Sequence, residues 1–549
     1  MVVTKRKYKK NVLRDVLAQK AETLGDKNWL TFVTDFDNGL DETYSYKDLH
    51  LFSNRLGNGL LNLGLQRGDG IGLMEPNSPE FLFTIFACFK IGTYTSLINT
   101  GLVGEGLIFI LDHSQAKAII INHEYLNTFL EVKDQLKNIK HVIVNLRDAP
   151  SDFKLPEGTI SLQEVMEASD DDITVEISLK DIVILMYTAG TTGLPKDVTF
   201  LQGRLIGGYK LEYVRSAFKT VYLRGDDVLF TALPLAHANA LFITTFNAYL
   251  NERPLILGKK FSASRHWNIC RKYHVTQFNT LGVMIPILMK QPEQPNDREH
   301  DVKIVHSAAC PKEVWEAFEN RFNVKILEFY GATDGGGFML NAMGYDEYPV
   351  GTMGKPIQGQ NASILDDDGT HLGPKEVGEL VFEWKEKEAK QRTVKYYRNE
   401  EASNSLIVAD KDGKKWFSTG DLAYYDENGW FFYMDRKKDV IRRRAENIAA
   451  YSIERIINQH DKILESAAYG IKTELGEDEV MVATVLQPGR TMTPEELLDY
   501  CKGKMADFMI PRYIEFVDEL PKNMVHRILK RELKKRGITQ NTYDKESRK

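Results

Sequence analysis

A glycine- and threonine-rich stretch that ends in a lysine is the clearest candidate for chemistry in this chain. It reads Tyr187-Thr188-Ala189-Gly190-Thr191-Thr192-Gly193-Leu194-Pro195-Lys196 and follows an apolar run at residues 182–186. An apolar run of this length before a turn predicts a buried strand. The glycines let backbone N–H groups line a concave turn, the threonine hydroxyls add donors, and Lys196 adds positive charge. We therefore expect a polyphosphate site, although the order of residues is not that of a Walker loop.

The elements that must position this stretch alternate between strands and amphipathic helices. Helical spacing of apolar residues predicts helices at residues 46–65 and 104–113, and Ser78-Pro79-Glu80 has the cap and first-turn proline that begin another helix. Strands are expected at residues 70–74, 94–98, 118–121, 228–232 and 304–307. This alternation predicts parallel α/β layers up to about residue 345.

The second part of the chain has a different pattern of predicted secondary structure. Short strands and turns dominate from Val350, which predicts a β-rich subdomain. After Arg436 a compact α+β unit is expected, with a helix at residues 452–459 and strands at 466–471 and 480–486. The predicted fold is therefore α/β, with a large N-terminal domain at residues 1–435 that includes the β-rich subdomain. A small, mobile α+β domain is expected at residues 436–549, after the charged joint at Lys437-Lys438.

Composition limits the classes of function that need to be considered. The chain has 549 residues and a net charge of −6, so bulk charge does not indicate a nucleic-acid partner. Its four cysteines lie far apart with no CxxC pair, which argues against a disulfide framework or zinc site and predicts a cytoplasmic location. The longest apolar stretches, near residues 81–91 and 281–289, are too short for an integral membrane segment.

Further motifs along the chain carry a resemblance to a known family. The glycine- and threonine-rich stretch resembles the signature of the adenylate-forming superfamily, and five further motifs stand in the order expected of that superfamily. They are Pro234-Leu235-Ala236-His237, Tyr330-Gly331-Ala332-Thr333-Asp334-Gly335, Ser418-Thr419-Gly420-Asp421, Asp435-Arg436-Lys437-Lys438-Asp439 and Glu519-Leu520-Pro521-Lys522-Asn523. This superfamily includes acyl- and aryl-CoA ligases, luciferases and nonribosomal adenylation domains. Within it the chain most resembles crotonobetaine/carnitine–CoA ligases and related acyl-CoA synthetases, through Pro79-Glu80-Phe81, Lys90-Ile91-Gly92 and the stretch from Ile510 to Pro521.

The resemblance implies a two-step reaction and a set of roles. A carboxylate attacks the α-phosphate of ATP to give an acyl-adenylate and pyrophosphate, and the thiol of coenzyme A then displaces AMP. Catalytic roles are implied for Lys196, Thr333, Asp334 and Arg527, with Asp334 also as the Mg²⁺ ligand. Nucleotide binding is implied for Thr188, Gly190, Thr191, Thr192, Gly193, Ala309, Tyr330, Gly331, Asp421 and Arg436.

The resemblance also implies a substrate side and partners. His237 and Gly282 would line the pocket for the acyl group, although packing in the core explains His237 nearly as well and Gly282 at least as well. Cys310 has no visible activating partner and is not expected to be a nucleophile. The expected partner is a small-molecule carboxylic acid, and the family makes a homodimer a reasonable expectation.

The chain departs from the family pattern at functional positions. Ala189 replaces a serine, Asp334 replaces a glutamate, and Asp197 adds a carboxylate that costs Coulomb energy beside a triphosphate unless it is turned away. Arg444-Ala445 replaces a glycine pair near the expected thiol path, and Arg527 stands where the family has its catalytic lysine. Two hypotheses remain open: a working acyl-CoA ligase, or a degenerate or repurposed member that binds nucleotide or acyl-adenylate with weak adenylation activity.

Overall fold

The computed structural model describes most of the chain and divides it into two compact units. Residues 12–188, 196–203, 205, 225–282, 284–341, 348–357, 359–385, 396–437, 440–443, 446–472, 478–523 and 528–547 are described. Unit 1 comprises Met1–Glu347, Ile357–Gly359 and Trp384–Leu406, and unit 2 comprises Tyr348–Pro356, Gln360–Glu383 and Ile407–Lys549. The predicted division after residue 435 falls inside unit 2 and stays a prediction.

One sheet of unit 1 carries the strand that precedes the glycine- and threonine-rich stretch. In spatial order its strands are β7 (Ile160–Ser161), β6 (His141–Asn145), β5 (Ala116–Asn122), β3 (Gly70–Met74), β4 (Tyr94–Leu97), β8 (Ile182–Thr188) and β9 (Lys196–Leu201). The ladders from β7 to β8 are parallel, as predicted, whereas β8 and β9 form an antiparallel pair. Lys196 is therefore the first residue of an edge strand that runs back along β8.

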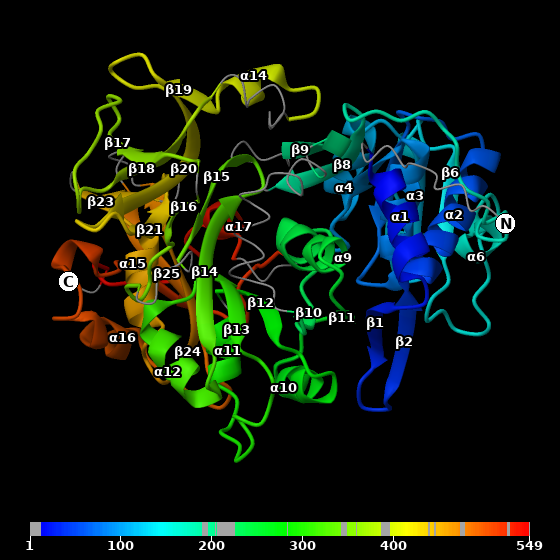
Figure 1. Cartoon of the computed structure of the whole chain (residues 1–549). Helices are drawn as coiled ribbons and strands as arrows, with labels where there is room; N and C mark the ends of the chain where they lie inside the picture. Colours follow the sequence, from blue (N-terminus) through cyan, green and yellow to red (C-terminus); the bar gives the residue numbers. More distant parts are fainter. Residues whose placement is uncertain are drawn as a thin grey trace. The chain divides into compact units, whose positions relative to one another are not determined.

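Helices cover both faces of this sheet, which explains why its strands are continuously apolar. The helices and short turns around it are α1 (Leu13–Leu24), α2 (Tyr46–Asn62), α3 (Pro79–Ile91), α4 (Gly104–His113), η1 (His123–Tyr125), α5 (Leu126–Leu130), η2 (Lys133–Gln135) and α6 (Leu162–Val165). Ile71, Leu73 and Ile120 belong to the core shared with α2 and α3, whereas Ile119 and Ile121 belong to the core shared with α4 and α5. A strand buried on both faces shows no polar alternation. Figure 1 shows these helices around the strands in blue and cyan.

Helix α3 begins where the sequence predicts. The Ser78 hydroxyl accepts a hydrogen bond from the Phe81 N–H at 3.1 Å, and Pro79 occupies the first turn. The helix ends at Gly92, whose φ of +76° is a conformation that glycine adopts without strain. Its residues are buried on almost every side, as expected of a helix that is apolar all round.

The other sheet of unit 1 carries the predicted site residues from His237 to Asp334. Its order is β15 (Gly335–Leu340), β14 (Lys325–Ala332), β13 (Ile304–Ala308), β12 (Gln277–Leu281), β10 (Leu229–Thr231), β11 (Leu255–Gly258), β1 (Asn28–Asp35) and β2 (Leu40–Ser45). The ladders from β14 to β1 are parallel, and the outer pairs β14–β15 and β1–β2 are antiparallel. The prediction of parallel layers is thus right for the interior of both sheets and wrong at their edges, where β8–β9, β14–β15 and β1–β2 pair antiparallel.

The remaining described helices of unit 1 are those around the second sheet and α14, which lies in the segment from Trp384 to Leu406. They are the π-helix η3 (Asn239–Phe246), α9 (Asn247–Leu250), α10 (Ala263–Lys272), α11 (Met284–Met289), α12 (Lys312–Phe322) and α14 (Glu400–Asn404). The apolar face of α12, formed by Trp315, Phe318 and Phe322, is buried. The structure therefore confirms the α/β class of this part of the chain.

Unit 2 contains the β-rich segment and the C-terminal segment. The first comprises β17 (Ala362–Leu365), β18 (Gly378–Glu383), β20 (Lys415–Tyr425), β19 (Ile407–Ala409) and β21 (Phe431–Arg436), paired antiparallel, together with the short β16 (Lys355–Pro356). The second comprises β22 (Ile441–Arg443), β23 (Glu446–Ile448), α15 (Ala450–Ile457), β24 (Ile463–Lys472), β25 (Asp478–Leu486), α16 (Pro494–Cys501), η5 (Asp507–Met509), β26 (Tyr513–Phe516), α17 (Lys530–Arg536) and β27 (Tyr543–Asp544).

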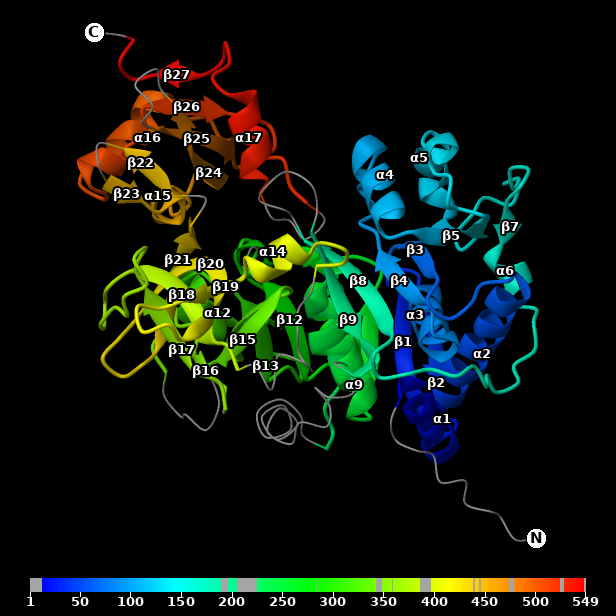
Figure 2. The ribbon, with the colours of Figure 1, turned by 90° about the horizontal axis from the view of Figure 1, so that it is seen from above.

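The C-terminal sheet, in the order β24-β25-β26-β27, is sandwiched by helices (Figure 2). Ala468 and Val482 share a core with α15 and α16. Ala467 and Met481 share another with Leu533 of α17. Successive strand residues point to opposite faces, so α17 covers the face opposite α15 and α16. This arrangement confirms the predicted α+β character of the segment.

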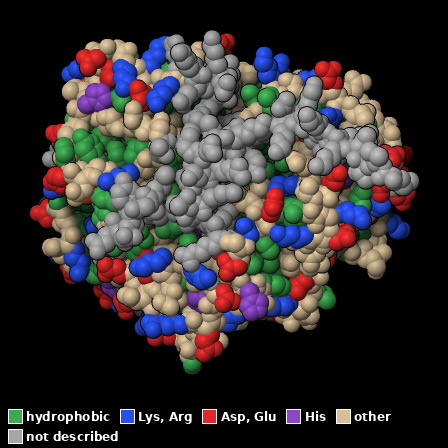
Figure 3. All heavy atoms as spheres, viewed as in Figure 1, with side chains coloured by type: hydrophobic (Ala, Val, Ile, Leu, Met, Phe, Trp, Pro, Cys, Tyr) green, Lys and Arg blue, Asp and Glu red, His purple; other side chains and the backbone are tan. Residues whose placement is uncertain are grey.

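The hydropathy of the helices and the distribution of surface charge characterise the described part of the chain. Among the described residues, no helix is long and apolar enough to cross a bilayer. Acidic and basic side chains are interspersed on the face that Figure 3 shows. All four cysteines are buried and free.

Candidate functional site

The parallel strands of the second sheet place several predicted site residues along one edge. The carboxyl ends of parallel neighbours lie at the same edge of a sheet, and His237 follows β10, Gly282 follows β12 and Ala309 follows β13. Gly282 and Ala309 are in direct contact, because a Cβ atom on Gly282 would lie 2.1 Å from the Ala309 carbonyl oxygen. The fold therefore places Gly282 beside Ala309, and both were predicted site residues. The close contact leaves no room for a side chain at position 282, so a glycine is required there.

His237 is partly buried and neutral. Burial lowers the pKa of its imidazole to about 4, and its Nε2 atom has no hydrogen-bond partner among the described residues. The following π-helix is tied to β12 because the Asn239 amide donates to the Thr280 carbonyl oxygen at 3.2 Å. An uncharged ring with a buried polar atom suits the edge of an acyl pocket, and that role remains a prediction.

The turn at Ala309 depends on a buried acid that the sequence analysis did not select. Ala309 has a φ of +68°, and the Glu328 carboxylate accepts hydrogen bonds from the backbone N–H groups of Ala309 and Cys310. Burial raises the Glu328 pKa to about 8, against the opposing effect of these two N–H groups. Glu328 thus holds the turn on the expected adenine side. A single acid within the apolar run at residues 326–329 is the signal that could have identified it.

The surroundings of Cys310 in this turn disfavour its thiolate form. Its side chain is buried, and desolvation together with the nearby Glu328 charge raises the pKa of its thiol. Because the thiolate is the reactive form, the structure agrees with the expectation that Cys310 is inert.

The predicted motif from Tyr330 to Gly335 forms a tight hairpin. Tyr330 pairs with Met339, Gly331 with Phe338 and Ala332 with Gly335, which leaves Thr333 and Asp334 at the tip. Gly335 and Gly336 have φ values of +98° and +86°, so the reversal uses conformations that favour glycine. The hairpin presents a hydroxyl and a carboxylate side by side, as the predicted roles require.

Lys196 and Asp334 are connected through an aromatic side chain from a distant segment. The Lys196 Nζ atom lies 5.0 Å from the centroid of the Tyr396 ring, and the Tyr396 hydroxyl donates a hydrogen bond to Asp334 Oδ2. Tyr396 is 3% exposed. All three residues belong to unit 1. The structure thus brings two predicted catalytic residues together and adds Tyr396, which the sequence analysis did not select.

The extra carboxylate at Asp197 is turned into the protein. Its side chain is 2% exposed and lies 3.0 Å from Nδ1 of His113. Burial raises the Asp197 pKa, and the nearby His113 acts in the opposite direction. The expected Coulomb cost to a triphosphate is therefore reduced, because the charge is directed at a histidine on α4.

In unit 2 the predicted ribose-binding residues form a direct ion pair. Asp421 and Arg436 are register partners on β20 and β21, and Arg436 Nε lies 2.7 Å from Asp421 Oδ1. The Asp421 side chain is 2% exposed and that of Arg436 is 31% exposed. The structure thus places these two predicted residues together within their unit.

Several predicted residues lie outside the described part of the chain. They are Gly190, Thr191, Thr192, Gly193 and Arg527, together with the side chain of Thr188. The lysines near Arg527 in sequence are engaged elsewhere: Lys530 pairs with Glu454 at 2.9 Å and Lys522 with Glu465 at 2.6 Å.

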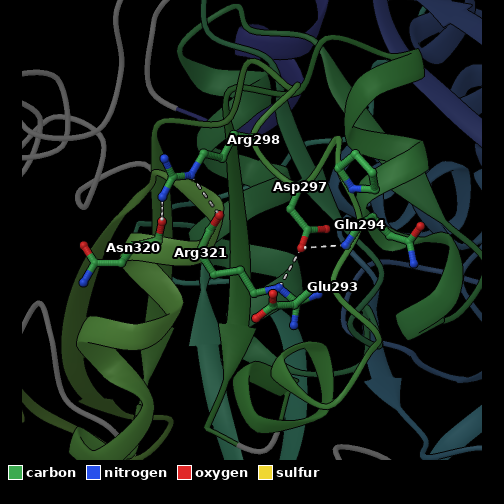
Figure 4. Close-up of a pocket in the computed structure, with 7 residues that line it drawn as sticks. Glu293, Gln294, Asp297, Arg298, Asn320 and Arg321 are labelled. Atoms are coloured by element: carbon green, nitrogen blue, oxygen red, sulfur yellow. Dashed lines mark hydrogen bonds and ion pairs between the residues drawn. The ribbon is translucent and has the colours of Figure 1, made fainter.

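A cavity of about 420 Å³ lies away from the predicted residues and is lined by the segment 293–298 after α11 and by Asn320 and Arg321 of α12 (Figure 4). Three of its charged side chains hold the loop, since Arg321 Nε lies 2.7 Å from the Asp297 carboxylate and Arg298 donates to the Asn320 carbonyl oxygen at 2.7 Å. We do not place the candidate site there, because these charges are already used in holding the loop.

Comparisons with known proteins identify the family. A family model described as AMP-binding enzyme matches residues 17–384, and one described as AMP-binding enzyme C-terminal domain matches residues 452–526. A crotonobetaine/carnitine–CoA ligase of Salmonella paratyphi B is 29% identical over 527 residues, covering 95% of this chain and 98% of that protein.

Solved structures share the fold. The anthranilate CoA ligase AuaEII, solved with anthranoyl-AMP, has a TM-score of 0.80 at 21% identity and covers 96% of this chain and 97% of its own. A benzoate CoA ligase from Burkholderia xenovorans LB400 has a TM-score of 0.78 at 22% identity and covers 95% of this chain and 99% of its own. The expected class, an AMP-forming acid–CoA ligase, agrees with these comparisons, and the chain belongs to the AMP-binding enzyme family.

Proposed function

We propose that this protein is an ATP-dependent acyl-CoA ligase that activates a carboxylic acid as an acyl-adenylate and transfers it to coenzyme A. The single observation that supports this most is the connection of Lys196 to Asp334 through Tyr396. Adenylation concentrates negative charge at the reacting phosphates, so a fixed cation and a site for a metal are the groups it needs.

The residues of this chain fit a magnesium ion in their chemistry. Mg²⁺ is commonly held by one or two carboxylates together with substrate phosphates, and Asp334 offers a carboxylate at the tip of its hairpin. When bound, the ion neutralises phosphate charge. Thr333 would donate to the α-phosphate, and Lys196 with the threonines of the loop would hold the β- and γ-phosphates.

The other predicted residues complete the proposed assignment. Tyr330 and the turn at Ala309 would contact adenine, and the Asp421 carboxylate, oriented by Arg436, would accept hydrogen bonds from the ribose hydroxyls. Arg527 would supply positive charge to the α-phosphate and the attacking carboxylate. The ion pairs of Lys522 and Lys530 favour Arg527 over either lysine for this task.

The identity of the carboxylic acid has to be measured directly. The names of the sequence relatives support testing crotonobetaine- and carnitine-like acids first. A cytoplasmic location and a homodimer remain predictions from cysteine usage and from the family, respectively.

The test is a pyrophosphate-release screen with ATP, Mg²⁺ and short, medium, aromatic and betaine-like acids, each with and without coenzyme A. We expect release that depends on one class of acid, and acyl-CoA formation only when coenzyme A is added. Release with none of the acids would contradict the proposal and favour a repurposed nucleotide-binding protein.

The arginine at position 527 gives a second test of the same proposal. Because the flat guanidinium replaces a point-like ammonium, we expect Arg527→Lys to raise the adenylation rate measured by pyrophosphate–ATP exchange. An unchanged or lower rate would show that the site is adapted to arginine.

A further inference from the structure

We propose that Tyr396 is a positioning residue for the metal-bound nucleotide: its hydroxyl orients the Asp334 carboxylate and its ring seats the Lys196 ammonium. This inference rests on the proposed function, because it assumes that Asp334 and Lys196 act on Mg²⁺ and ATP. Tyr396 lies outside the motifs quoted in the sequence analysis.

Two separate contacts of one side chain carry the inference. The Tyr396 hydroxyl donates to Asp334 Oδ2, and the face of its ring lies 5.0 Å from Lys196 Nζ. An ammonium over an aromatic face is attracted by the ring, and a hydrogen bond to one carboxylate oxygen restricts the rotation of the group. A single tyrosine therefore fixes a cation and an anion that lie far apart in the sequence.

The backbone around Tyr396 holds the ring in register with Lys196. Tyr396 forms an isolated antiparallel bridge with Val198, and the Tyr397 N–H donates to the Asp197 carbonyl oxygen at 3.2 Å. The Tyr396 N–H donates to Ser403 Oγ at 3.0 Å, which ties the tyrosine to α14. The segment is thus fastened to β9 at the residues directly after Lys196.

The hydrogen bond from Tyr396 matters more because Asp334 stands where the family has a glutamate. Aspartate is one methylene shorter, so its carboxylate has less reach and depends more on correct orientation. Partners that hydrogen-bond to a metal-binding carboxylate commonly change metal affinity 10- to 100-fold when they are removed. The hydroxyl of Tyr396 occupies that position here.

The hydroxyl and the ring can be tested separately by calorimetry. ATP binding is titrated at a series of Mg²⁺ concentrations and again in EDTA, for wild type, Tyr396→Phe and Tyr396→Leu. For Tyr396→Phe we expect an increase of about 10-fold in the Mg²⁺ concentration that gives half-maximal binding, with the affinity in EDTA changed by less than about 2-fold. For Tyr396→Leu we expect the same metal effect and, in addition, a loss of about 5-fold in EDTA.

The neighbouring Tyr397 offers a matched control. Its hydroxyl lies 3.3 Å from that of Tyr94, and Tyr397→Phe should bind ATP as wild type does in both conditions. An unchanged Mg²⁺ requirement in Tyr396→Phe would overturn the role of the hydroxyl. Equal affinity of the Phe and Leu variants in EDTA would overturn the role of the ring.

The binding measurement also separates this inference from the proposed function. A wild-type protein that binds Mg²⁺ and ATP but releases pyrophosphate with no acid contradicts the ligase activity, while the comparison of Tyr396 variants still decides the positioning role. A ligase whose Tyr396→Phe variant keeps wild-type metal dependence contradicts only the positioning role.

Discussion

Opposite charges of the candidate site are connected in two different ways in the two units. In unit 1, Lys196 and Asp334 are linked through the ring and hydroxyl of Tyr396. In unit 2, Asp421 and Arg436 contact each other directly at 2.7 Å as partners in one antiparallel ladder. A direct pair largely neutralises its own field, whereas an intervening ring keeps the cation and the anion as separate groups.

This difference matches the chemistry proposed for each unit. A triphosphate and its metal need a cation and an anion at separate points, while ribose hydroxyls are neutral and need an oriented hydrogen-bond acceptor. We infer that the arrangement in unit 1 governs charge on the phosphates and that the pair in unit 2 governs recognition of the sugar. Substitutions of Lys196 and Asp421 test this comparison directly, and substitutions of the buried acids Glu328 and Asp197 test the surroundings of the unit 1 site.

The largest effect is expected from Lys196→Ala. Removing the cation takes away charge stabilisation in the first half-reaction, so we expect acid-dependent pyrophosphate–ATP exchange to fall about 100-fold or more. Thioester formation from supplied acyl-adenylate and coenzyme A should change by less than about 5-fold by the same reasoning. Equal losses in both assays would break the assignment, and the exposed Lys180→Ala is the control for a general loss of lysine charge.

A smaller effect is expected from Asp421→Asn in unit 2. The amide keeps the size but loses the charge that accepts the ribose hydroxyls, so KM for ATP should rise about 10- to 30-fold. The variant should discriminate less between ATP and 2′-deoxy-ATP than wild type does. An unchanged preference for ATP would contradict the sugar-recognition role, and Asp412→Asn provides an exposed control on the same subdomain.

Because Glu328, the buried acid at the Ala309 turn, has a raised pKa, we expect the stability of the protein to depend on pH. The folded-state pKa of Glu328 is raised to about 8, so between the unfolded value of 4.5 and 8 the folded state holds a proton that the unfolded state has released. Unfolding then releases this proton, and stability falls as pH rises through that window. We expect Glu328→Gln to reduce the fall in Tm between pH 5.5 and pH 8 by roughly 2 °C or more.

The control for this measurement is Glu316→Gln, an exposed acid on α12. It should lose as much Tm over the same pH range as wild type. If Glu328→Gln behaves like this control, the burial of the Glu328 carboxylate does not set the pH response.

The smallest effect is expected from Asp197→Asn. Because this side chain is 2% exposed and directed at His113, its charge should have little influence on bound phosphates. KM for ATP should change by less than about 2-fold, as a shielded charge contributes little to a distant one. A several-fold gain in ATP affinity would show that Asp197 does oppose the triphosphate.

Local signals in the sequence were sufficient for much of the fold. The serine, proline and glutamate at residues 78–80 predicted the start of α3, and apolar runs predicted the strands whose carboxyl ends carry the site. Such features depend on neighbouring residues, so a single sequence contains them. The antiparallel edges β9 and β15 were not predicted, because their direction depends on the hairpins that precede them.

The contacts that complete the site could not be predicted from local sequence signals, because they join residues that lie far apart in the chain. Tyr396 stands in an ordinary aromatic pair, and its role appears only when the backbone bridge to Val198 brings it to Lys196 and Asp334. The importance of Glu328 comes from two backbone N–H groups, those of Ala309 and Cys310 after β13, which donate to its carboxylate. The sequence left the direction of the Asp197 side chain open, and its contact with His113 at the end of α4 shows that it points into the protein.

Pyrophosphate–ATP exchange in wild type and Lys196→Ala, across the acid panel and with Mg²⁺ varied, tests the central claim most directly. We expect Mg²⁺-dependent exchange with one class of acid in wild type and near-complete loss of that exchange in Lys196→Ala. Exchange that is absent in wild type with every acid, or that survives in Lys196→Ala, would contradict the claim.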